Sequence, residues 1–456
     1  MVRVRFAPSP TGFLHIGNAR MAVVNWLYAL KHQGDFILRL DDTDTQRSQE
    51  EYIQQILADL AWLSIRPTVV HRQSERFARY EACTNQLKKT GRLYPCYETP
   101  EELELKQKRQ LARGAPPLYD RAALKLSQQE REALEAQGIQ PHWRFLLEDK
   151  PVHWHDLARG DIHFQGNALS DPVLVRSDGI PVYTLASVVD DIDMGITHIL
   201  RGEDHVSNSA VQLQLFEALG CKADAIHLGH LPLLTNATGQ GFSKREGSLS
   251  LKQLQEQGIE PMAIYSLLAR LGTSAEIHPE WDVNVLVQSF DLALFSRSSP
   301  QFDMAELEKL NGMLLHKMSF EDAEKRLRGM SLPKLSQKFW EVIRGNLTHV
   351  SDVQDWHDRV FLGRFPTPDM LSLEMPSLEV LQSALRHFPE SSSPWDEDTW
   401  GRWTQVLALE TGRKGKALFL PLRLALTGMA HGPEMRLLLP LMEPEEVKKR
   451  LQASID

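Results

Sequence analysis

A strand-like run that passes at once into a rigid loop constrains this chain more than any other stretch. Residues 2–6 read Val-Arg-Val-Arg-Phe, so apolar and basic side chains alternate as they do along a β-strand. Residues 8–18 contain two prolines and Gly12, which end the strand, and apolar residues at helical spacing follow Gly17. The pattern therefore predicts that His15 and Gly17 lie where a strand passes into a helix N-terminus. An open α/β sheet binds nucleotide phosphate at that place.

A second loop, far downstream, carries two adjacent cations between glycines. Residues 239–247 read Gly-Gln-Gly-Phe-Ser-Lys-Arg-Glu-Gly, with Lys244 and Arg245 in the middle. Taken alone, Ser-Lys-Arg is typical of a solvated surface turn. In this order after residues 8–18, however, the two loops resemble the two signature motifs of class I aminoacyl-tRNA synthetases.

Three further segments narrow this resemblance. Residues 36–44 form an apolar strand-like run that ends in acids, and residues 183–191 have the same form, which we interpret as a second such strand. Residues 201–205, Arg-Gly-Glu-Asp-His, follow a predicted strand over residues 197–200. Together these segments resemble a bacterial-type glutamyl-tRNA synthetase. The similarity continues to residues 421–428 and so covers nearly the whole chain.

The composition is that of an ordinary globular enzyme. A chain of 456 residues is too long for one core and fits about three domains. The hydrophobic fraction of 42% and the charged fraction of 24% are typical of globular proteins, and no apolar run is long enough to span a bilayer. The strand begins at residue 2, so we expect no signal or transit peptide. Three scattered cysteines predict reduced thiols and a cytoplasmic location.

The charge balance gives weak information about a nucleic-acid partner. A net charge of -9 by itself argues against phosphate binding, which needs Lys and Arg. Two local basic segments are candidates for tRNA contact, residues 106–109 with Arg113 and residues 413–416 with Arg423. Each segment also fits a solvated helix face or loop.

The expected fold class is α/β: a split Rossmann-like class I synthetase catalytic domain with an α+β insertion, followed by an all-α anticodon-binding region. The resemblance implies the following ranges: 1–80 and 176–248 for the two catalytic halves, 81–175 for an insertion that binds the acceptor end, 249–310 for a stem-contact linker domain with the signature lysine loop at its start, and 311–456 for the helical anticodon-binding region.

The resemblance implies a two-step ligation of glutamate to tRNA. The glutamate carboxylate attacks the α-phosphorus of ATP, pyrophosphate leaves, and glutamate then passes from the adenylate to the 3′-terminal adenosine of tRNA. Because the nucleophile is already an anion, the enzyme needs alignment and charge stabilisation rather than a general base. His15 and Lys244 are the expected catalytic residues, and ATP with Mg²⁺ is the expected cofactor.

The same resemblance assigns residues to the two small substrates. The expected ATP-binding residues are Thr11, His15, Gly17, His205, Leu233, Leu234 and Lys244. Arg5 and Arg201 are expected to bind the glutamate side-chain carboxylate, with Tyr183 and Ser187 nearby, because arginine binds a carboxylate bidentately. Ser9 and Asp41 are expected to bind the ammonium group. A different interpretation of Arg5 and Arg201 is a surface ion pair at a strand end, which Arg201 would form with Glu203 or Asp204.

The chain departs from the family pattern in three places. Asn18 stands where many class I members have a second histidine, a position at which the family varies. Asp41 stands where the family usually has a glutamate, and the shorter side chain moves the charge by about one methylene. Some relatives hold zinc in the insertion, and the corresponding positions here are Cys96, Glu98, Tyr119 and Arg121. One soft ligand opposite an arginine does not make a zinc site, so we predict no structural zinc.

Three other functions compete with this interpretation. A glutaminyl-tRNA synthetase usually ends in β-barrels, and a truncated relative that glutamylates a modified tRNA base lacks the C-terminal half, whereas this tail has a helical pattern. A non-catalytic tRNA-binding paralogue would be expected to have lost His15, Lys244, Arg5 and Arg201. Two alternatives for the tRNA stay open, the glutamate tRNA alone or the glutamine tRNA as well or instead. That choice depends on how the helical domain reads the third anticodon base, and the sequence does not identify which residue in the region 343–350 reads it. The family is usually monomeric, so we expect a monomer.

Overall fold

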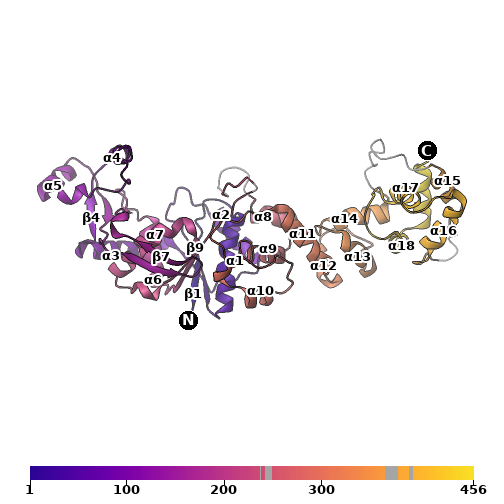
Figure 1. Cartoon of the computed structure of the whole chain (residues 1–456), viewed down its shortest axis with the longest axis horizontal. Coiled ribbons are helices and arrows are strands. Elements are labelled where there is room, and N and C mark those ends of the chain that lie inside the picture. Colours follow the sequence, from indigo (N-terminus) through magenta and orange to yellow (C-terminus); the bar gives the residue numbers. More distant parts are fainter. Residues whose placement is uncertain (237, 242–248, 365–377, 390–393, 456) are drawn as a thin grey trace. The chain divides into compact units, whose positions relative to one another are not determined.

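The computed structural model describes residues 1–236, 238–241, 249–364, 378–389 and 394–455. The chain divides into two compact units, which Figure 1 shows coloured along the sequence. The first unit consists of Met1–Leu254 and Ile264–Asp303, and the second consists of Gln255–Ala263 and Met304–Asp456. In the part of the chain that is described, no helix combines the length and the apolar character needed to cross a membrane.

A seven-stranded sheet organises the first unit, in the order β3-β2-β1-β9-β10-β6-β7. Its strands are β1 (Arg3–Phe6), β2 (Asp35–Leu40), β3 (Val69–Arg72), β6 (Val152–Asp156), β7 (Gly160–Phe164), β9 (His198–Gly202) and β10 (His227–Leu231). All neighbouring pairs are parallel except β6 and β7, which form an antiparallel hairpin. Because β2 and β9 flank β1, the order reverses there, and open α/β sheets bind ligands at such a switch point.

The predicted start of the chain is confirmed. The alternating residues form β1, and helix α1 (Ile16–Lys31) begins directly after His15 and packs on β1, β2 and β9. The helix α2 (Glu50–Trp62) follows β2 in sequence. Val23, Val24 and Leu27 on α1 are fully buried, because this helix covers the middle of the sheet.

The predicted strand over residues 183–191 is wrong. These residues form helix α6 (Tyr183–Asp193), which packs against α3 (Phe77–Lys89) and α7 (Val206–Ala218). Leu185, Val188 and Val189 are buried at helical spacing, but Ser187 and Asp191 are buried as well. A helix that is buried around most of its circumference produces a continuous apolar run, and periodicity cannot distinguish such a run from a buried strand.

A separate three-stranded antiparallel sheet lies within the predicted insertion. Its strands are β4 (Leu93–Cys96), β5 (His142–Phe145) and β8 (Val173–Val175), and it is accompanied by α4 (Pro100–Ala112) and α5 (Gln128–Ala136). Helix α4 begins with a capping box, which Thr99 and Glu102 form around Pro100. The β6–β7 hairpin also lies within residues 81–175, but its two strands extend the large sheet.

Helices make up the remaining elements. α8 (Leu251–Glu256), α9 (Pro261–Leu268) and α10 (Val283–Ser289) follow the large sheet in sequence. The described residues of the second unit form α11 (Met304–Leu315), α12 (Phe320–Leu327), α13 (Gln337–Ile343), α14 (Asp352–His357), α15 (Leu378–Arg386), α16 (Thr399–Thr411), α17 (Lys416–Thr427), α18 (Met435–Leu438) and α19 (Pro444–Ala453). Phe339, Trp340, Trp403 and Leu422 lie in their common core, which confirms the predicted helical tail.

Candidate active site

A cleft with a volume of about 550 Å³ opens at the carboxyl ends of β1, β2 and β9. It lies at the switch point of the sheet, where the first loop was predicted to bind nucleotide. Of the residues predicted to bind ATP or glutamate, those that line the cleft are Arg5, Ser9, His15, Gly17, Asp41, Tyr183, Arg201, His205, Leu233 and Leu234.

Two predicted site residues are not among those that line the cleft, and a third lies outside the described residues. Ser187 is fully buried on α6, where its Oγ accepts a hydrogen bond from Gln212 Nε2 at 3.0 Å. Thr11 is half-buried in the loop after β1, and its backbone N–H donates to the Ser9 carbonyl at 2.8 Å. Lys244, on the second loop, lies outside the described residues. The roles of these three residues stay predictions.

His15 caps helix α1 through its ring. Its Nδ1 accepts from the backbone N–H groups of Gly17 at 3.1 Å and Asn18 at 3.3 Å, while Asn18 Oδ1 accepts from the His15 N–H at 3.4 Å. With Nδ1 as acceptor, a neutral ring carries its proton on Nε2, which can donate to a phosphate oxygen. A Cβ at Gly17 would meet the His15 ring at 3.0 Å, so a larger residue here would have to displace the ring. Asn18 thus acts as part of the cap.

A buried ion network joins two of the predicted glutamate-binding residues. Arg5 Nε donates to Asp191 at 3.2 Å, and Arg39 Nη1 donates to the same carboxylate at 2.7 Å. Arg39 Nε donates to Asp41 at 2.7 Å, and Arg39 has no exposed surface. Burial raises the pKa of Asp41 and the neighbouring Arg39 opposes that shift. Arg39 therefore fixes Asp41, directly after β2, relative to Arg5 on β1.

Arg201 is held in a different way, by neutral groups. Its Nη1 donates to the Tyr183 hydroxyl at 3.1 Å, and its Nη2 donates to Ser209 Oγ at 2.5 Å and to Gln212 Oε1 at 2.6 Å. Burial lowers the pKa of Arg201, so its charge lies in a poorly solvated place. Among the described residues no carboxylate oxygen lies within 4.0 Å of this guanidinium.

The strand-end ion pair considered for Arg201 is not formed. The Glu203 carboxylate pairs with Arg159, and Asp204 lies 3.8 Å from His205 Nε2. His205 also faces the cleft, and burial, together with the charge of Arg201, lowers its pKa to about 4. It is therefore a neutral ring at neutral pH, able to exchange hydrogen bonds with a ligand without adding charge.

Several residues that shape the cleft were not predicted from the sequence. Arg20, on α1, donates to the carbonyls of Pro232 at 2.6 Å and Leu271 at 3.0 Å, so it holds the loop after β10. Arg39 could have been found, because it precedes Asp41 by two residues and therefore faces the same side of β2. Asp191 gave no such indication, since its partners lie more than 150 residues away in sequence.

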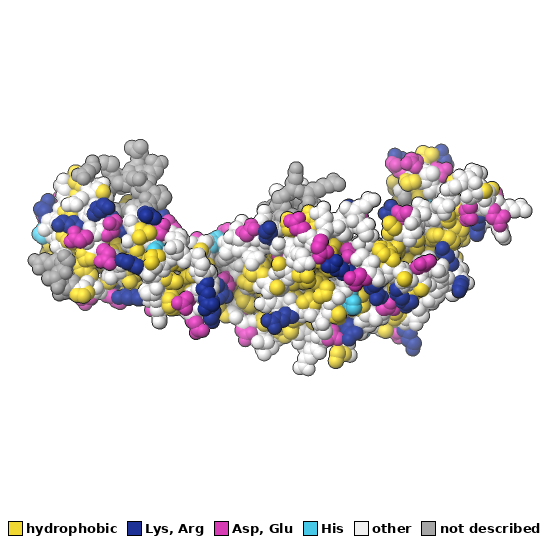
Figure 2. Space-filling view, turned by 180° about the vertical axis from the view of Figure 1, so that it is seen from behind, with side chains coloured by type: hydrophobic (Ala, Val, Ile, Leu, Met, Phe, Trp, Pro, Cys, Tyr) yellow, Lys and Arg dark blue, Asp and Glu magenta, His cyan; other side chains and the backbone are white. Residues whose placement is uncertain are grey.

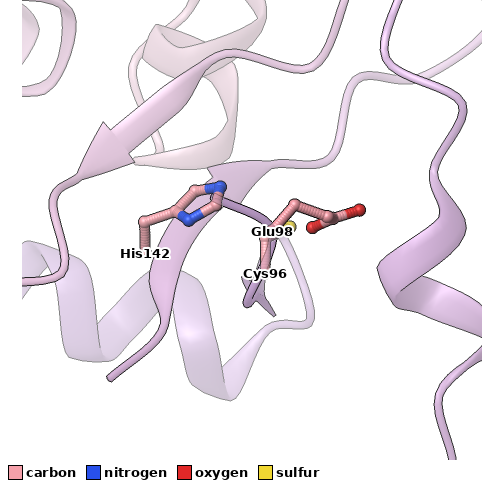
Figure 3. Close-up of side chains that lie close together, drawn as sticks. All are labelled: Cys96, Glu98 and His142. Carbon is pink, nitrogen blue, oxygen red and sulfur yellow. The ribbon is translucent and has the colours of Figure 1, made fainter. Parts of the chain in front are cut away.

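The positions considered for zinc are arranged differently from expectation. Arg121 faces Asp171, with Nη2 to Oδ1 at 2.9 Å, and so does not oppose the cysteine. Instead, Figure 3 shows His142, at the start of β5, beside Cys96 and Glu98 from the end of β4. One ligand atom from each of these three residues lies within 4.8 Å of the others. Arg121 was therefore the wrong fourth position, and His142 was missed.

This cluster has features for and against a divalent ion. Glu98 Oε2 and His142 Nε2 are buried and have no hydrogen-bond partner, which would suit a ligand pair. Two cations oppose it: Lys106 Nζ lies 3.3 Å from Glu98 Oε1, and the Arg144 guanidinium lies 4.1 Å from the centre of the Tyr119 ring. The Tyr119 hydroxyl already spans Glu98 at 2.8 Å and Cys96 Sγ at 3.6 Å.

The two basic segments proposed for tRNA contact differ in exposure. Lys108, in the first segment, is exposed and pairs with Glu104, whereas Arg423, in the second, is only partly exposed and donates to the Pro433 carbonyl at 2.8 Å. Figure 2 shows positive and negative side chains interspersed over the face in view, which agrees with a modest net charge.

Two ranges of the chain match known protein families. Residues 1–309 match the family described as the catalytic domain of class I tRNA synthetases for glutamate and glutamine, and residues 315–455 match the anticodon-binding domain family. The fold, the cleft at the switch point and these matches define a class I aminoacyl-tRNA synthetase, and the chain belongs to that family.

Relatives of known activity narrow the class. The chain is 51% identical over 455 residues to Glutamate--tRNA ligase 2 of Beijerinckia indica subsp. indica, which covers 99% of each chain. It is 50% identical over 451 residues to Glutamate--tRNA ligase of Azospirillum brasilense, covering 99% of this chain and 98% of the relative. The activity of the chain is that of a bacterial glutamate–tRNA ligase, an ATP-dependent aminoacylation.

Solved structures agree with this assignment. A glutamate tRNA ligase from Elizabethkingia meningosepticum, crystallised in complex with its amino acid, has a TM-score of 0.82 and 28% identity to this chain. The glutamate-tRNA synthetase of Elizabethkingia anophelis has a TM-score of 0.83, also at 28% identity. Each similarity covers 100% of this chain and 99% of the other. The expectation of an α/β catalytic domain followed by a helical anticodon-binding region is confirmed.

Proposed function

We propose that the cleft between β1 and β9 binds glutamate and ATP side by side. The observation that carries this proposal is that two buried guanidinium groups, those of Arg5 and Arg201, line one cleft together with the carboxylate of Asp41. Two cations suit the glutamate side-chain carboxylate, and a carboxylate with Ser9 suits its ammonium group. Tyr183 and Ser187 support Arg201, directly and through Gln212.

The other end of the cleft suits ATP. Its residues are the helix cap His15 with Gly17, the neutral ring of His205, and Leu233 and Leu234 after β10. The N-terminus of α1 favours phosphate, because its backbone N–H groups and dipole point there. We assign charge stabilisation on the α-phosphate to His15 and Lys244, and a further ATP contact to Thr11. Mg²⁺ accompanies ATP and reduces the repulsion between the phosphates and the incoming carboxylate.

Substitution of Arg201 tests the glutamate assignment. Arg201→Ala removes charge-assisted hydrogen bonds and should raise the KM for glutamate roughly 10- to 100-fold in ATP–pyrophosphate exchange with tRNA present. It should also narrow the preference for glutamate over glutamine, because glutamine presents an amide NH₂ that guanidinium donors reject. Arg3→Ala is the matched control, since Arg3 lies on β1 but pairs with Asp35 at 2.8 Å. An unchanged glutamate-to-glutamine ratio in folded Arg201→Ala would contradict the assignment.

The division of labour along the chain is also a proposal. Residues 81–175 would bind the acceptor end of tRNA, residues 249–310 would contact its stem, and residues 311–456 would read the anticodon. Two substrates remain possible, the glutamate tRNA alone or the glutamine tRNA as well or instead. Charging assays with the two purified tRNAs decide between them. We further propose a monomer, testable by sedimentation, and a cytoplasmic location, which the unpaired cysteines support.

We also propose that the cluster of Cys96, Glu98 and His142 holds no structural zinc. Zinc would bring two positive charges next to Lys106 and the guanidinium of Arg144, and the repulsion is large where water is excluded. Glu98 is already partnered by Lys106 and Tyr119, and these hydrogen bonds hold its pKa below the ordinary value although burial opposes them. The tyrosine hydroxyl then links the carboxylate and the sulfur as a metal would.

A further inference from the structure

A buried hydrogen-bonded chain runs behind Arg201, on the side away from the cleft. Ser209 Oγ lies 2.7 Å from His230 Nε2, and His230 Nδ1 lies 2.5 Å from Asp156 Oδ2. Each of these three residues is at most 1% exposed. None of them lines the cleft, so they do not touch a ligand bound there.

Hydrogen-bond chemistry fixes the direction of this chain. Asp156 can only accept, so His230 carries a proton on Nδ1 and offers Nε2 as an acceptor. The Ser209 hydroxyl proton has two acceptors within reach, His230 Nε2 at 2.7 Å and the His205 carbonyl at 3.1 Å. It goes to the nearer Nε2, and the Ser209 oxygen is left to accept from Arg201 Nη2. Burial lowers the pKa of His230 although Asp156 opposes the shift, which keeps the imidazole neutral and its Nε2 free of a second proton.

Asp156 is itself firmly anchored. Its Oδ1 accepts from the backbone N–H groups of Ala158, Arg159 and His230 at 3.0 to 3.1 Å, and its Oδ2 also accepts from Trp154 Nε1 at 3.2 Å. These donors fix the carboxylate in place and leave it no freedom to approach the guanidinium of Arg201. The negative charge is therefore separated from the cation by the imidazole of His230, whose Nε2 lies 3.5 Å from Arg201 Nε.

We propose that Asp156, His230 and Ser209 are positioning residues that hold Arg201 as a carboxylate-specific donor. This inference rests on the proposed role of Arg201 in binding glutamate. Ser209 and Gln212 occupy Nη2 and Tyr183 occupies one hydrogen of Nη1, so the guanidinium cannot rotate without breaking buried hydrogen bonds. All three partners are neutral, so the full positive charge is available to the substrate. Arg5, by contrast, already shares its charge with Asp191.

The hydrogen-bonded chain also connects the predicted insertion with the predicted catalytic domain. Asp156 is the last residue of β6, and it reaches Arg201 through His230 on the adjacent strand β10. The β6–β7 hairpin lies within the predicted insertion and in neither half of the predicted catalytic domain. It thus supplies the far end of the hydrogen-bonded chain that orients Arg201. Removing one residue of this hydrogen-bonded chain should raise the KM for glutamate. It should leave the KM for ATP unchanged, because ATP binds at the other end of the cleft.

Ser209→Ala tests this proposal in the full-length enzyme. The variant leaves one buried Arg201 hydrogen without its acceptor and frees the guanidinium to turn, so the KM for glutamate should rise roughly 5- to 100-fold. The KM for ATP should stay within about twofold, and the preference for glutamate over glutamine should fall in the same variant. Ser266→Ala is the matched control, because Ser266 is an equally buried helical serine that accepts from the Glu280 N–H at 2.9 Å, away from the cleft.

His230 provides a second, graded test. His230→Gln can still accept from Ser209 and donate to Asp156, whereas His230→Leu can do neither, so the glutamine variant should keep a lower KM for glutamate than the leucine variant. Circular dichroism and thermal unfolding establish that each variant is folded. The proposal is overturned if folded Ser209→Ala keeps the wild-type KM for glutamate, if both KM values rise together, or if the two His230 variants are equally impaired. A wild-type enzyme without glutamate-dependent exchange would instead remove the proposed function itself.

Discussion

Arg39 is the residue whose loss should disturb the amino-acid end of the cleft most broadly. It has no exposed surface and bridges Asp41 and Asp191, each at 2.7 Å. Replacing it with methionine keeps much of the side-chain volume and removes the charge. Asp191 would keep Arg5 at 3.2 Å, but Asp41 would lose its only ion-pair partner among the described residues.

The size of the effect follows from this difference. Breaking a buried ion pair by removing one partner costs about 3–5 kcal/mol, because the remaining charge is left in a poorly solvated place. Asp41 lies at the cleft wall, where it can take up a proton or contact water, so we expect about 3 kcal/mol. The double variant Arg39→Met with Asp41→Asn removes the stranded charge and should recover a large part of this loss.

Urea unfolding of the first unit, followed by circular dichroism, measures the stability change, and pyrophosphate exchange measures the KM for glutamate. The KM should rise in Arg39→Met and should not recover in the double variant, because the ammonium contact of Asp41 is lost in both. Arg47→Met is the control: Arg47 and Asp44 are 2.6 Å apart but exposed, and the midpoint should not move. A loss below about 1 kcal/mol in Arg39→Met, or full recovery of the KM in the double variant, would refute the reasoning.

Three other predictions concern different parts of the chain. Lys244→Ala should slow glutamate activation roughly 100-fold or more with tRNA affinity unchanged, and a rate within about threefold of wild type would reject its role. Asp59→Asn should stabilise the protein above pH 6: burial raises the pKa of Asp59 to about 6, so folding favours its protonated form, and stability is lost as pH rises from about 4 through 6. The gain at pH 8 should approach about 3 kcal/mol and vanish near pH 4 in urea titrations, and equal effects at both pH values would contradict it. Elemental analysis of dialysed protein should find no stoichiometric zinc, and one zinc per chain would disprove our interpretation of Cys96, Glu98 and His142.

Local sequence was sufficient wherever neighbours within a few residues determine the structure. The alternating run and its proline-rich end predicted β1 and the start of α1. In these places turn chemistry, capping and periodicity act over one or two turns of chain, so the sequence carries them directly. Arg5, Asp41 and Arg201, which line the cleft, were instead named by the resemblance, and they lie outside the two signature loops.

Tertiary structure decided what depends on burial and on the order of the strands. Residues 183–191 form a helix that is covered on most sides. Such burial removes the alternation of apolar and polar residues by which periodicity distinguishes a helix from a strand. Asp191 meets Arg5 and Arg39, and Asp156 reaches Arg201 through His230, only because strands and helices distant in sequence lie side by side. His142, rather than Arg121, joins Cys96 for the same reason, since β4 and β5 pair across more than 40 residues of chain. Buried charged residues pair with those that the fold brings close to them. Which residues are close depends on the order of the strands, and no local pattern of residues specifies that order.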